Sequence, residues 1–570
     1  MRKRMFLSAA AFGMALCLIG VCGAAPAEGT NSTGLSATEE QNETAQAQQT
    51  DPAERETLVV GLQTDSFITD YEDNYMTKKI EDDLNVNLEI YELPAAAKDV
   101  QTKVSLMATS GEDMPDILIT TALSLDAVFD YGSKGIFIPL NEYIQREDTN
   151  FAKIEENDKE TILNTITMAD GNIYTLPKFA DNLWNYTPNR LYINTVWLEK
   201  LGLEVPETTD ELYEVLKAFR DQDPNGNGAQ DELGVYGYTA GDYGEDIVDT
   251  LMNAFVFYNG GSKNGGLALD ETGKTVIAPF TTEEWRQGLQ YMKMLYDEGL
   301  FVPSVFTDDL TQFRATLNNE VNVVGLTSAG STSNWTDCDN NVNFLEMSMI
   351  PPLTGPEGVC YAVNGGSTFN AAFMITEKCE NPELAFKVGD WFMDPQNSRI
   401  ARYGENGVDW TDDPETCSQN TNAYVEAGLV DSVNCVWLTN IWSEPSNKFW
   451  RNNNPYYESM DNVNRVASGV TPFDETTKSG MLYAYNLEWY SDKHPEHMLE
   501  TLHYTVEESS TCTKIIMEVT EFIEQSKAEF ITGQRNLDTG WESYLNELDS
   551  LGLNTWMEIA QTAYDRSLEQ

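Results

Sequence analysis

Short apolar runs and amphipathic stretches alternate over the first folded part of the chain. Residues 57–62 form an apolar run with β-branched side chains, residues 86–91 alternate between apolar and polar, and residues 116–120 form a second apolar run. These patterns predict strands, and the stretches at 75–84 and 98–107, which have helical spacing, predict helices between them. This strand–helix–strand order predicts an α/β fold with a largely parallel sheet.

Helical patterns are more frequent later in the chain. Threonines followed by acidic residues predict the starts of helices at 211–220 and 285–298, because such residues satisfy the free backbone N–H groups of a first turn. Residues 381–392 and 513–530 predict two more helices. No internal repeat of fixed period is present, which argues against a solenoid or a propeller.

The N-terminus has the three parts of a secretory signal. Basic residues at 2–4 precede an apolar run at 5–21, and small residues follow. We predict a signal peptide over 1–22 that ends at Cys22 in a sequence resembling a bacterial lipobox, so that Cys22 carries a lipid anchor. Residues 23–55 are rich in Ser, Thr, Gln, Glu and Ala and predict a flexible tether. The expected location is the extracellular face of the cytoplasmic membrane; cleavage a few residues later would give a secreted protein.

The composition changes which partners are plausible. The chain has 570 residues, with 92 Asp and Glu against 35 Lys and Arg, a formal net charge of −57. Its aromatic fraction of 11% is too high for a disordered acidic chain, so the charge belongs to a folded surface. Such a surface repels phosphate backbones and anionic lipids, which excludes nucleic-acid binding and electrostatic membrane docking. Neutral and cationic small molecules remain possible ligands.

Six cysteines lie beyond the signal peptide and its lipobox-like end, and none forms a C-x-x-C pair. They are Cys338, Cys360, Cys379, Cys417, Cys435 and Cys512. The missing C-x-x-C pattern argues against a zinc ribbon or a thioredoxin-type site. An exported chain with this even number could contain up to three disulfides or could keep buried free thiols, and the spacing decides neither.

Several short motifs resemble segments of bacterial extracellular solute-binding proteins. The most extensive lie at 105–117, 135–140 and 170–177. Further matches, in the order expected for that family, lie at 191–198, 295–300, 371–387, 403–407 and 530–564. Each motif alone carries little information, but together they cover roughly residues 57–565 in the family's order.

The resemblance implies a two-lobed, periplasmic-binding-protein-like α/β fold with a hinge and an interlobe cleft. It implies a first lobe over 56–180 with a return segment at 366–440, and a second lobe over 181–365 with the C-terminal segment 441–570. In that family the ligand binds in the cleft, the lobes close, and an ABC transporter permease receives the cargo. The expected protein is a monomer that meets the membrane only through its lipid anchor.

Residues 223–232 match the spacing of a calcium-binding loop. Oxygen-bearing side chains stand at positions 1, 3, 5 and 9 of the loop, and Gly228 stands at position 6, where a sharp turn is needed. Position 12 is Gly234 in place of the usual Glu, and the resemblance to alginate-binding members of the family implies that Glu232 substitutes for it. The expected ligands of a structural Ca²⁺ are Asp223, Asn225, Asn227, the Ala229 carbonyl, Asp231 and Glu232. The alternative is an ordinary Asn-Gly turn.

Aromatic and polar residues cluster where the family resemblance places the cleft. Aromatic faces can cover the C–H side of a sugar ring, while amides and a guanidinium bond its hydroxyls. The predicted ligand contacts are Trp184, Tyr186, Asn189, Arg190, Trp335, Tyr403, Glu405, Trp410 and Trp437. For each tryptophan the alternative is core packing.

The catalytic motifs of common enzyme classes are missing from the sequence. The chain has no Gly-x-Ser-x-Gly elbow, Walker loop or dinucleotide glycine motif, and His494 and His497 lack the spacing of a helical zinc site. We therefore predict a binding protein for an oligosaccharide and no enzyme. A peptide or other polar-solute receptor of the same fold stays possible, as does a secreted glycosidase, which needs only two suitably placed carboxylates.

Overall fold

The computed structural model describes most of the chain beyond the predicted tether. The described residues are 52–110, 114–239, 244, 246–261, 264–336, 341, 343–365, 368–439, 445–470 and 484–568. Cys22 and Cys338 lie outside them. No helix within these ranges is both long and apolar enough to cross a membrane.

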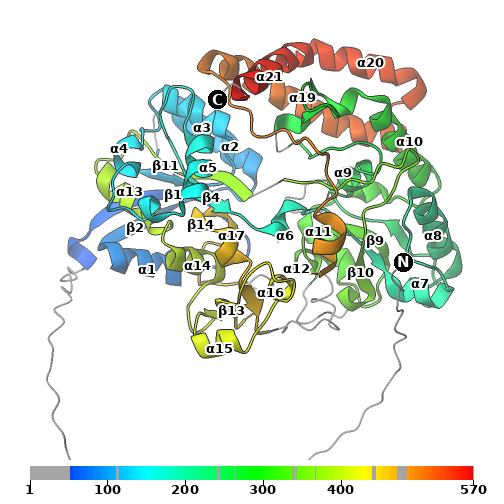
Figure 1. Cartoon of the computed structure of the whole chain (residues 1–570), viewed down its shortest axis with the longest axis horizontal. Helices are drawn as coiled ribbons and strands as arrows, with labels where there is room; N and C mark the ends of the chain where they lie inside the picture. The colour runs from blue at the N-terminus through cyan, green and yellow to red at the C-terminus, as the bar shows by residue number, and fades with distance from the viewer. Residues whose placement is uncertain are drawn as a thin grey trace, which may run out of the picture. The chain divides into compact units, whose positions relative to one another are not determined.

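The first lobe is built on a six-stranded sheet (Figure 1). Its strands, in spatial order, are β14 (Tyr456–Glu458), β4 (Leu176–Ala180), β11 (Thr368–Ile375), β3 (Ile117–Ile119), β1 (Glu56–Gln63) and β2 (Val86–Leu93). Only β11 runs against its neighbours β3 and β4; β1 is parallel to β2 and β3, and β14 is parallel to β4. The carboxyl ends of five strands therefore lie at one edge of the sheet.

The second lobe is built on a four-stranded sheet. Its strands, in spatial order, are β10 (Met347–Ile350), β5 (Arg190–Asn194), β9 (Val324–Ala329) and β6 (Leu233–Val235). The register pairs Arg190 with Ala329 and Leu191 with Ile350, so the start of β5 and the ends of β9 and β10 share one edge.

Three segments cross between the lobes. The first, 181–189, leaves the first lobe after β4 and enters β5, and the second, 351–367, leaves β10 and enters β11. The third crossing follows β15 and reaches the second lobe at the helical turn Asn486–Tyr490. The first two crossings thus join the carboxyl edge of the first sheet to the edge of the second sheet that contains Arg190, which is where ligands bind in open α/β sheets.

A small third sheet extends the first lobe. It contains β12 (Trp410–Thr411), β13 (Cys435–Trp437) and β15 (Val466–Ser468). The described residues 445–470 belong to the first lobe, because β14 pairs with β4 and because Phe449 and Trp450 lie in the first-lobe core. The sequence analysis had assigned these residues to the second lobe as part of 441–570.

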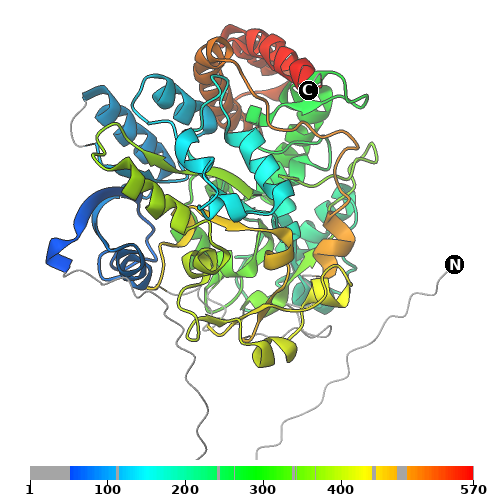
Figure 2. The same ribbon diagram turned by 60° about the vertical axis from the view of Figure 1, so that its left-hand side comes forward.

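Helices cover both sheets (Figures 1 and 2). Those of the first lobe are α1 (Tyr75–Leu84), α2 (Ala97–Ser110), α3 (Leu125–Ser133), α4 (Asn141–Ile144), α5 (Glu156–Ile166), α13 (Pro382–Trp391), α14 (Pro395–Tyr403), α15 (Pro414–Ser418), α16 (Ala423–Glu426) and α17 (Met460–Val463). The first crossing contains α6 (Leu183–Tyr186), and the second lobe has α7 (Thr195–Leu201), α8 (Thr209–Gln222), α9 (Ile247–Met252), α10 (Glu283–Asp297), α11 (Leu310–Leu317), α12 (Thr332–Trp335), α19 (Val506–Thr532), α20 (Leu537–Ser550) and α21 (Leu553–Ser567). The C-terminal helix α19 packs along α10.

Capping residues determine where the long helices begin. The Thr208 side chain accepts a hydrogen bond from the Glu211 N–H, and the Glu211 carboxylate accepts one from the Thr208 N–H, so α8 begins at Thr209, two residues before the predicted start at 211. Helix α19 begins at Val506, earlier than the predicted start at residue 513, because Thr505 and Glu508 form the same reciprocal pair.

The structure shows whether five of the six cysteines form disulfides, a question that the sequence left open. Within the described residues these side chains are free thiols: Cys360, Cys379, Cys417, Cys435 and Cys512. Four of the five are buried and Cys360 is partly buried, so they pack as small apolar side chains.

Candidate ligand-binding cleft

Polar side chains gather at the carboxyl edge of the first sheet. The Asn453 amide donates to the carbonyls of Gln63 and Thr64 at 3.2 Å each, and the Thr121 hydroxyl donates to the Asn453 Oδ1 at 3.4 Å. Gln63 ends β1, and Thr121 follows β3. This edge therefore presents amide and hydroxyl groups next to the crossings.

The first crossing adds an aromatic hydroxyl and a second amide. Tyr186 is half-buried, and its hydroxyl donates a hydrogen bond to the Asp181 carboxylate. Burial and this hydrogen bond raise the pKa of Tyr186 above its usual range, so the phenol stays protonated. The Asn189 side-chain amide donates to the Thr250 hydroxyl at 3.0 Å. Both side chains lie where the first lobe passes into the second.

Two other predicted ligand contacts of this crossing have structural partners. The Arg190 guanidinium is fully buried and lies 3.7 Å from the centre of the Trp184 ring. It donates to the Trp184 and Gly330 carbonyls and, at 2.6 Å, to the Asn486 Oδ1. Trp184 itself is only 9% exposed. Trp184 and Arg190 are thus engaged with each other and with the second lobe.

Three more of the predicted contacts lie in hydrophobic cores. Trp335 is the last residue of α12, is 0% exposed and packs against Tyr192 with ring centres 5.6 Å apart. Tyr403 and Trp410 are buried in the first-lobe core, where the Trp410 indole N–H donates to the Gly404 carbonyl at 2.8 Å. Their burial assigns these rings to packing, where the sequence analysis expected ligand contacts, because α12, α14 and β12 each turn the aromatic side chain into the core of its own lobe.

The remaining two predicted contacts lie on the small third sheet and beside it. Glu405 is half-buried and forms an ion pair with Lys448. Trp437 is half-buried and packs against Tyr403 with ring centres 5.6 Å apart. Its indole N–H is buried and has no hydrogen-bond acceptor within the described part of the chain. Among the described residues, Trp437 is therefore a donor that no acceptor satisfies, near the surface of the first lobe.

The sequence analysis missed Asp181, Thr121 and Asn453 as cleft residues. Thr121 comes directly after the predicted strand at 116–120, Asp181 comes directly after β4, which the sequence analysis did not predict, and Asn453 precedes the short strand β14. The rule that ligands bind at the carboxyl ends of parallel strands would have indicated Thr121. Asn453 had no such signal, because β14 is too short to be recognised in the sequence.

The predicted calcium loop follows α8. Asp223 has left-handed backbone (φ 46°), and its carboxylate accepts hydrogen bonds from the N–H groups of Gly226, Asn227 and Gly228 at 3.0–3.1 Å. The side-chain amides of Asn225 and Asn227 donate to Asp231. In this arrangement the described residues hold no group of three or more His, Cys, Asp or Glu side chains close enough to bind a metal.

Glu232 is the exception in this hydrogen-bonded loop. Both of its carboxylate oxygens are buried, and neither has a hydrogen-bond partner among the described residues. Burial raises the pKa of Glu232, and the nearby Asp231 and Asp223 raise it further. A buried carboxylate without a donor, beside a loop of oxygen ligands, is the donor set that suits Ca²⁺.

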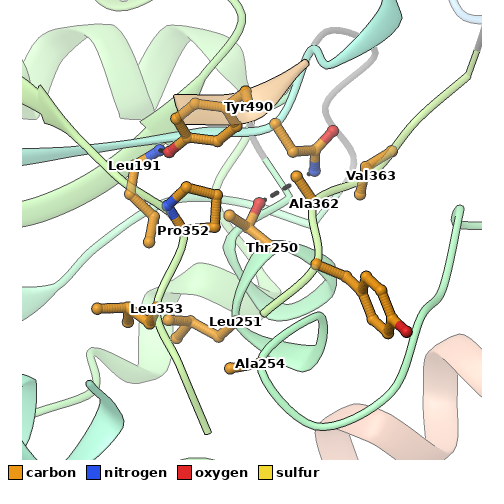
Figure 3. Close-up of a pocket in the computed structure, with 11 residues that line it drawn as sticks. Leu191, Thr250, Leu251, Ala254, Pro352, Leu353, Ala362, Val363 and Tyr490 are labelled. Atoms are coloured by element: carbon orange, nitrogen blue, oxygen red, sulfur yellow. Dashed lines mark hydrogen bonds between the residues drawn. The ribbon is translucent and has the colours of Figure 1, made fainter. Parts of the chain in front are cut away.

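A mostly apolar pocket, with Asn189 among its lining residues, lies in the second lobe (Figure 3). Leu191 of β5, Leu251 of α9, Leu353 of the second crossing and Tyr490 contribute to its lining. The pocket therefore marks the place where all three crossings approach one another in the second lobe.

Comparisons with known proteins agree with this architecture. The family model described as "Bacterial extracellular solute-binding protein" matches residues 72–398, more than half of the chain. The chain is 25% identical over 482 residues to the fructooligosaccharide ABC transporter substrate-binding protein FusA of Streptococcus pneumoniae. The aligned region covers 82% of this chain and 83% of FusA. It is 28% identical over 224 residues to the polygalacturonan/rhamnogalacturonan-binding protein YtcQ of Bacillus subtilis, or 39% of this chain and 40% of YtcQ.

Solved structures show the same two-lobed fold. FusA of S. pneumoniae in complex with kestose superposes with a TM-score of 0.73 at 22% identity, covering 90% of this chain and 100% of that one. Another FusA structure with the same TM-score of 0.73 is an EF-hand mutant in complex with fructo-nystose. The alginate-binding protein AlgQ2 without calcium ion superposes with a TM-score of 0.67 at 21% identity, covering 90% of this chain and 99% of AlgQ2. The predicted α/β fold with two lobes is confirmed.

Proposed function

The chain belongs to the bacterial extracellular solute-binding protein family, and from this we propose that it captures an oligosaccharide between its two lobes and delivers it to an ABC transporter permease. The similarity to FusA over most of both chains carries the proposal, because FusA is a substrate-binding protein of an oligosaccharide ABC transporter. The protein would act as a monomer outside the cell, held at the membrane by a lipid on Cys22.

The chemistry at the crossings suits a neutral, hydroxyl-rich ligand. Tyr186, Asn189 and Asp181 offer a phenol, an amide and a carboxylate beside the amide and hydroxyl groups of the first-lobe edge. Sugar hydroxyls act as both donors and acceptors, so mixed groups of this kind can satisfy them. Tyr186 is therefore the main proposed ligand contact. Asn189, which is only 8% exposed and already donates to Thr250, and Trp437 on the first lobe are further candidates.

The sequence analysis left two alternatives to an oligosaccharide receptor, a glycosidase and a peptide receptor of the same fold. Homologues of the chain are substrate-binding proteins and not enzymes, which argues against a glycosidase. A peptide receptor of the same fold would need partners for charged chain termini, and the groups that support the sugar proposal at the first crossing are mostly neutral.

A thermal-shift screen of the purified mature protein tests this proposal. The screen compares kestose and nystose, oligogalacturonides, and tri- to pentapeptides, all in buffer with calcium. A ligand at about 100 times its Kd adds about 2.7 kcal/mol to the free energy of unfolding, so a glycan hit gives a clear rise in Tm. The Tyr186→Phe variant should keep its ligand-free Tm and show a smaller rise.

Each outcome of the screen points to one ligand class. A neutral glycan hit supports a receptor similar in ligand class to FusA, and an oligogalacturonide hit supports an acidic-glycan receptor. A rise in Tm with peptides and none with any glycan would overturn the oligosaccharide proposal while leaving the fold intact.

The proposal includes one structural Ca²⁺ in the loop after α8. Asp223, Asn225, Asn227, the Ala229 carbonyl, Asp231 and Glu232 would hold the ion. The Glu232 carboxylate supports this site, because its oxygens are buried and find no hydrogen-bond donor among the described residues. Hard cations prefer such oxygen ligands. The bound ion would supply charge compensation to the acids and stiffen the loop; it has no part in ligand chemistry.

Removing calcium is expected to lower the Tm of the wild-type protein, because an ion at about 100 times its Kd contributes about 2.7 kcal/mol. In Glu232→Gln, calcium should raise the Tm much less than in the wild type. In chelator, however, this variant should have a higher Tm than the wild type, because it no longer buries an uncompensated carboxylate. Differential scanning calorimetry in Ca²⁺ and in EGTA measures both. Identical wild-type melts in the two buffers would contradict the calcium site.

A further inference from the structure

Arg451 has a backbone conformation that a long side chain rarely adopts. Its φ is 60°, in the left-handed region, where glycine is at ease and where asparagine and aspartate are the commonest other residues. Such a conformation costs free energy and persists only where the surrounding structure holds it, so strained residues cluster at functional sites. The strain at Arg451 therefore points to a function for its side chain.

The helical turn that contains Arg451 is attached to the carboxyl edge of the first sheet. The turn spans Arg451–Asn453, and the Asn453 amide donates to the carbonyls of Gln63 and Thr64 at the end of β1. The Arg451 side chain is 14% exposed, and its guanidinium carbon lies 3.8 Å from the centre of the Phe67 ring. Phe67 belongs to the loop that follows β1. Arg451 and Phe67 therefore lie on the cleft side of the first lobe.

A second arginine approaches the same ring from the second lobe. Arg314 of α11 has its guanidinium carbon 5.8 Å from the centre of the Phe67 ring, and its Nη1 donates to the Asn334 carbonyl at 2.8 Å. Asn334 belongs to α12, which follows β9 at the edge of the second sheet that contains Arg190. The cleft edge of each lobe thus contributes one guanidinium, and we call Arg451 and Arg314 the arginine pair.

The two positive charges of the arginine pair disfavour each other. Asp65, whose carboxylate lies 3.4 Å from the Nη1 of Arg451, offsets part of the charge. Burial lowers the pKa of Arg451, Asp65 raises it, and the nearby Arg314 lowers it again. A carboxylate bound between the two arginines would be attracted by both, and hydrogen bonds between charged groups are roughly twice as strong as neutral ones. The arginine pair is therefore suited to an anionic group of a ligand.

We propose that the cleft takes a glycan with an acidic unit, and that Arg451 of the first lobe and Arg314 of the second lobe bind the carboxylate of that unit. The mostly neutral groups at the crossings bind hydroxyls, which acidic sugars share with neutral ones, so the arginine pair supplies the selection for charge. This proposal rests on the proposed function, because it names the class of oligosaccharide that the cleft binds.

Isothermal titration calorimetry of the full-length mature protein compares oligogalacturonides and oligomannuronates with their methyl esters, and with kestose and nystose. The esters keep the sugar rings and lose the negative charge. The wild-type protein should bind an acidic glycan at least about tenfold more tightly than its ester, as expected for hydrogen bonds to a charged group. Equal affinity for acid and ester, or binding of neutral glycans alone, would overturn this proposal and leave the oligosaccharide receptor intact. Binding of no glycan at all would contradict both proposals.

Two variants test which residues select the charge. Arg451→Met and Arg314→Met should each lose most of the preference for the acid over the ester. Arg399→Met is the matched control, because Arg399 is 6% exposed, lies 5.9 Å from the centre of the Trp410 ring and donates to Asn434 beside the small third sheet. This control should keep the wild-type preference.

A wild-type preference that survives in either arginine-pair variant, or that is lost equally in the control, would overturn the assignment. If one variant fails to fold, the other variant and the comparison of acid and ester in the wild-type protein decide.

Discussion

Replacing Lys527 by methionine is expected to lower the free energy of unfolding by about 3–5 kcal/mol, because among the described residues it removes the only cation that pairs with the largely buried Asp246 and Asp249; its third partner, Glu524, is 43% exposed. The Lys527 side chain is 1% exposed, and its Nζ lies 2.6 Å from Asp249, 2.7 Å from Glu524 and 3.8 Å from Asp246. Charge neutralisation by these acids raises the pKa of Lys527 despite its burial, so the lysine is an ammonium ion. Methionine would fill its space and leave the acids unpaired.

The effect should reach the cleft, since Asp246 caps the N-terminus of α9 and its carbonyl accepts a hydrogen bond from Asn189. Chemical denaturation of wild type and Lys527→Met measures the loss. Lys293→Met is the control: its lysine pairs with Asp297 at 2.8 Å on the exposed side of α10 and should change stability by less than about 1 kcal/mol. A Lys527→Met variant as stable as the control would show that the acids are neutral without the lysine.

Truncating Trp335 to alanine is expected to cost about 3–5 kcal/mol of stability, the usual loss for a large aromatic side chain removed from a core. The ring is 0% exposed and packs against Tyr192 inside the second lobe. Trp335→Phe, which keeps part of the volume, should lose less. Urea unfolding with tryptophan-independent detection, such as far-ultraviolet circular dichroism, compares the three proteins. A Trp335→Ala protein with unchanged stability and abolished glycan binding would return Trp335 to the ligand site.

The fold of the first lobe could be predicted because its strands carry their own signal. The runs at 57–62 and 116–120 are continuous and apolar, as expected of strands buried on both faces, and they became β1 and β3. Helix starts were equally local, since a cap such as Thr208 and its partner Glu211 lie within four residues. Both kinds of signal depend only on neighbours in the chain.

The lobe to which residues 445–470 belong could not be predicted. Strand β14 is three residues long, and it joins the first sheet by pairing with β4, whose residues lie far away in the sequence. A strand so short carries no periodicity of its own. Its place depends on tertiary pairing alone, and the predicted boundary at residue 441 failed for that reason.

The sequence could indicate which residues belong to the first crossing, but it could not predict the orientation of their side chains. Polar and aromatic residues do cluster at the first crossing, as expected from the family resemblance. However, Trp335 and Trp410 lie among Gly, Ser, Asn and Asp residues, a composition typical of exposed loops. The neighbouring sequence contains no signal that each ring is buried in the core of its own lobe. Arg190 likewise offers the chemistry of a sugar contact, and only its hydrogen bonds to Trp184, Gly330 and Asn486, the last two 140 and 296 residues away, show that it is engaged with structural partners.

Isothermal titration calorimetry with the best glycan from the screen, followed by mass spectrometry of the recovered glycan, tests the central claim most directly. The account predicts one glycan bound per protein chain, a negative heat-capacity change from apolar burial, and a glycan recovered with its mass unchanged. Glycan recovered in shorter pieces would make the protein a glycosidase. An absence of binding heat for every glycan class, with the protein folded and loaded with calcium, would contradict the oligosaccharide-receptor function.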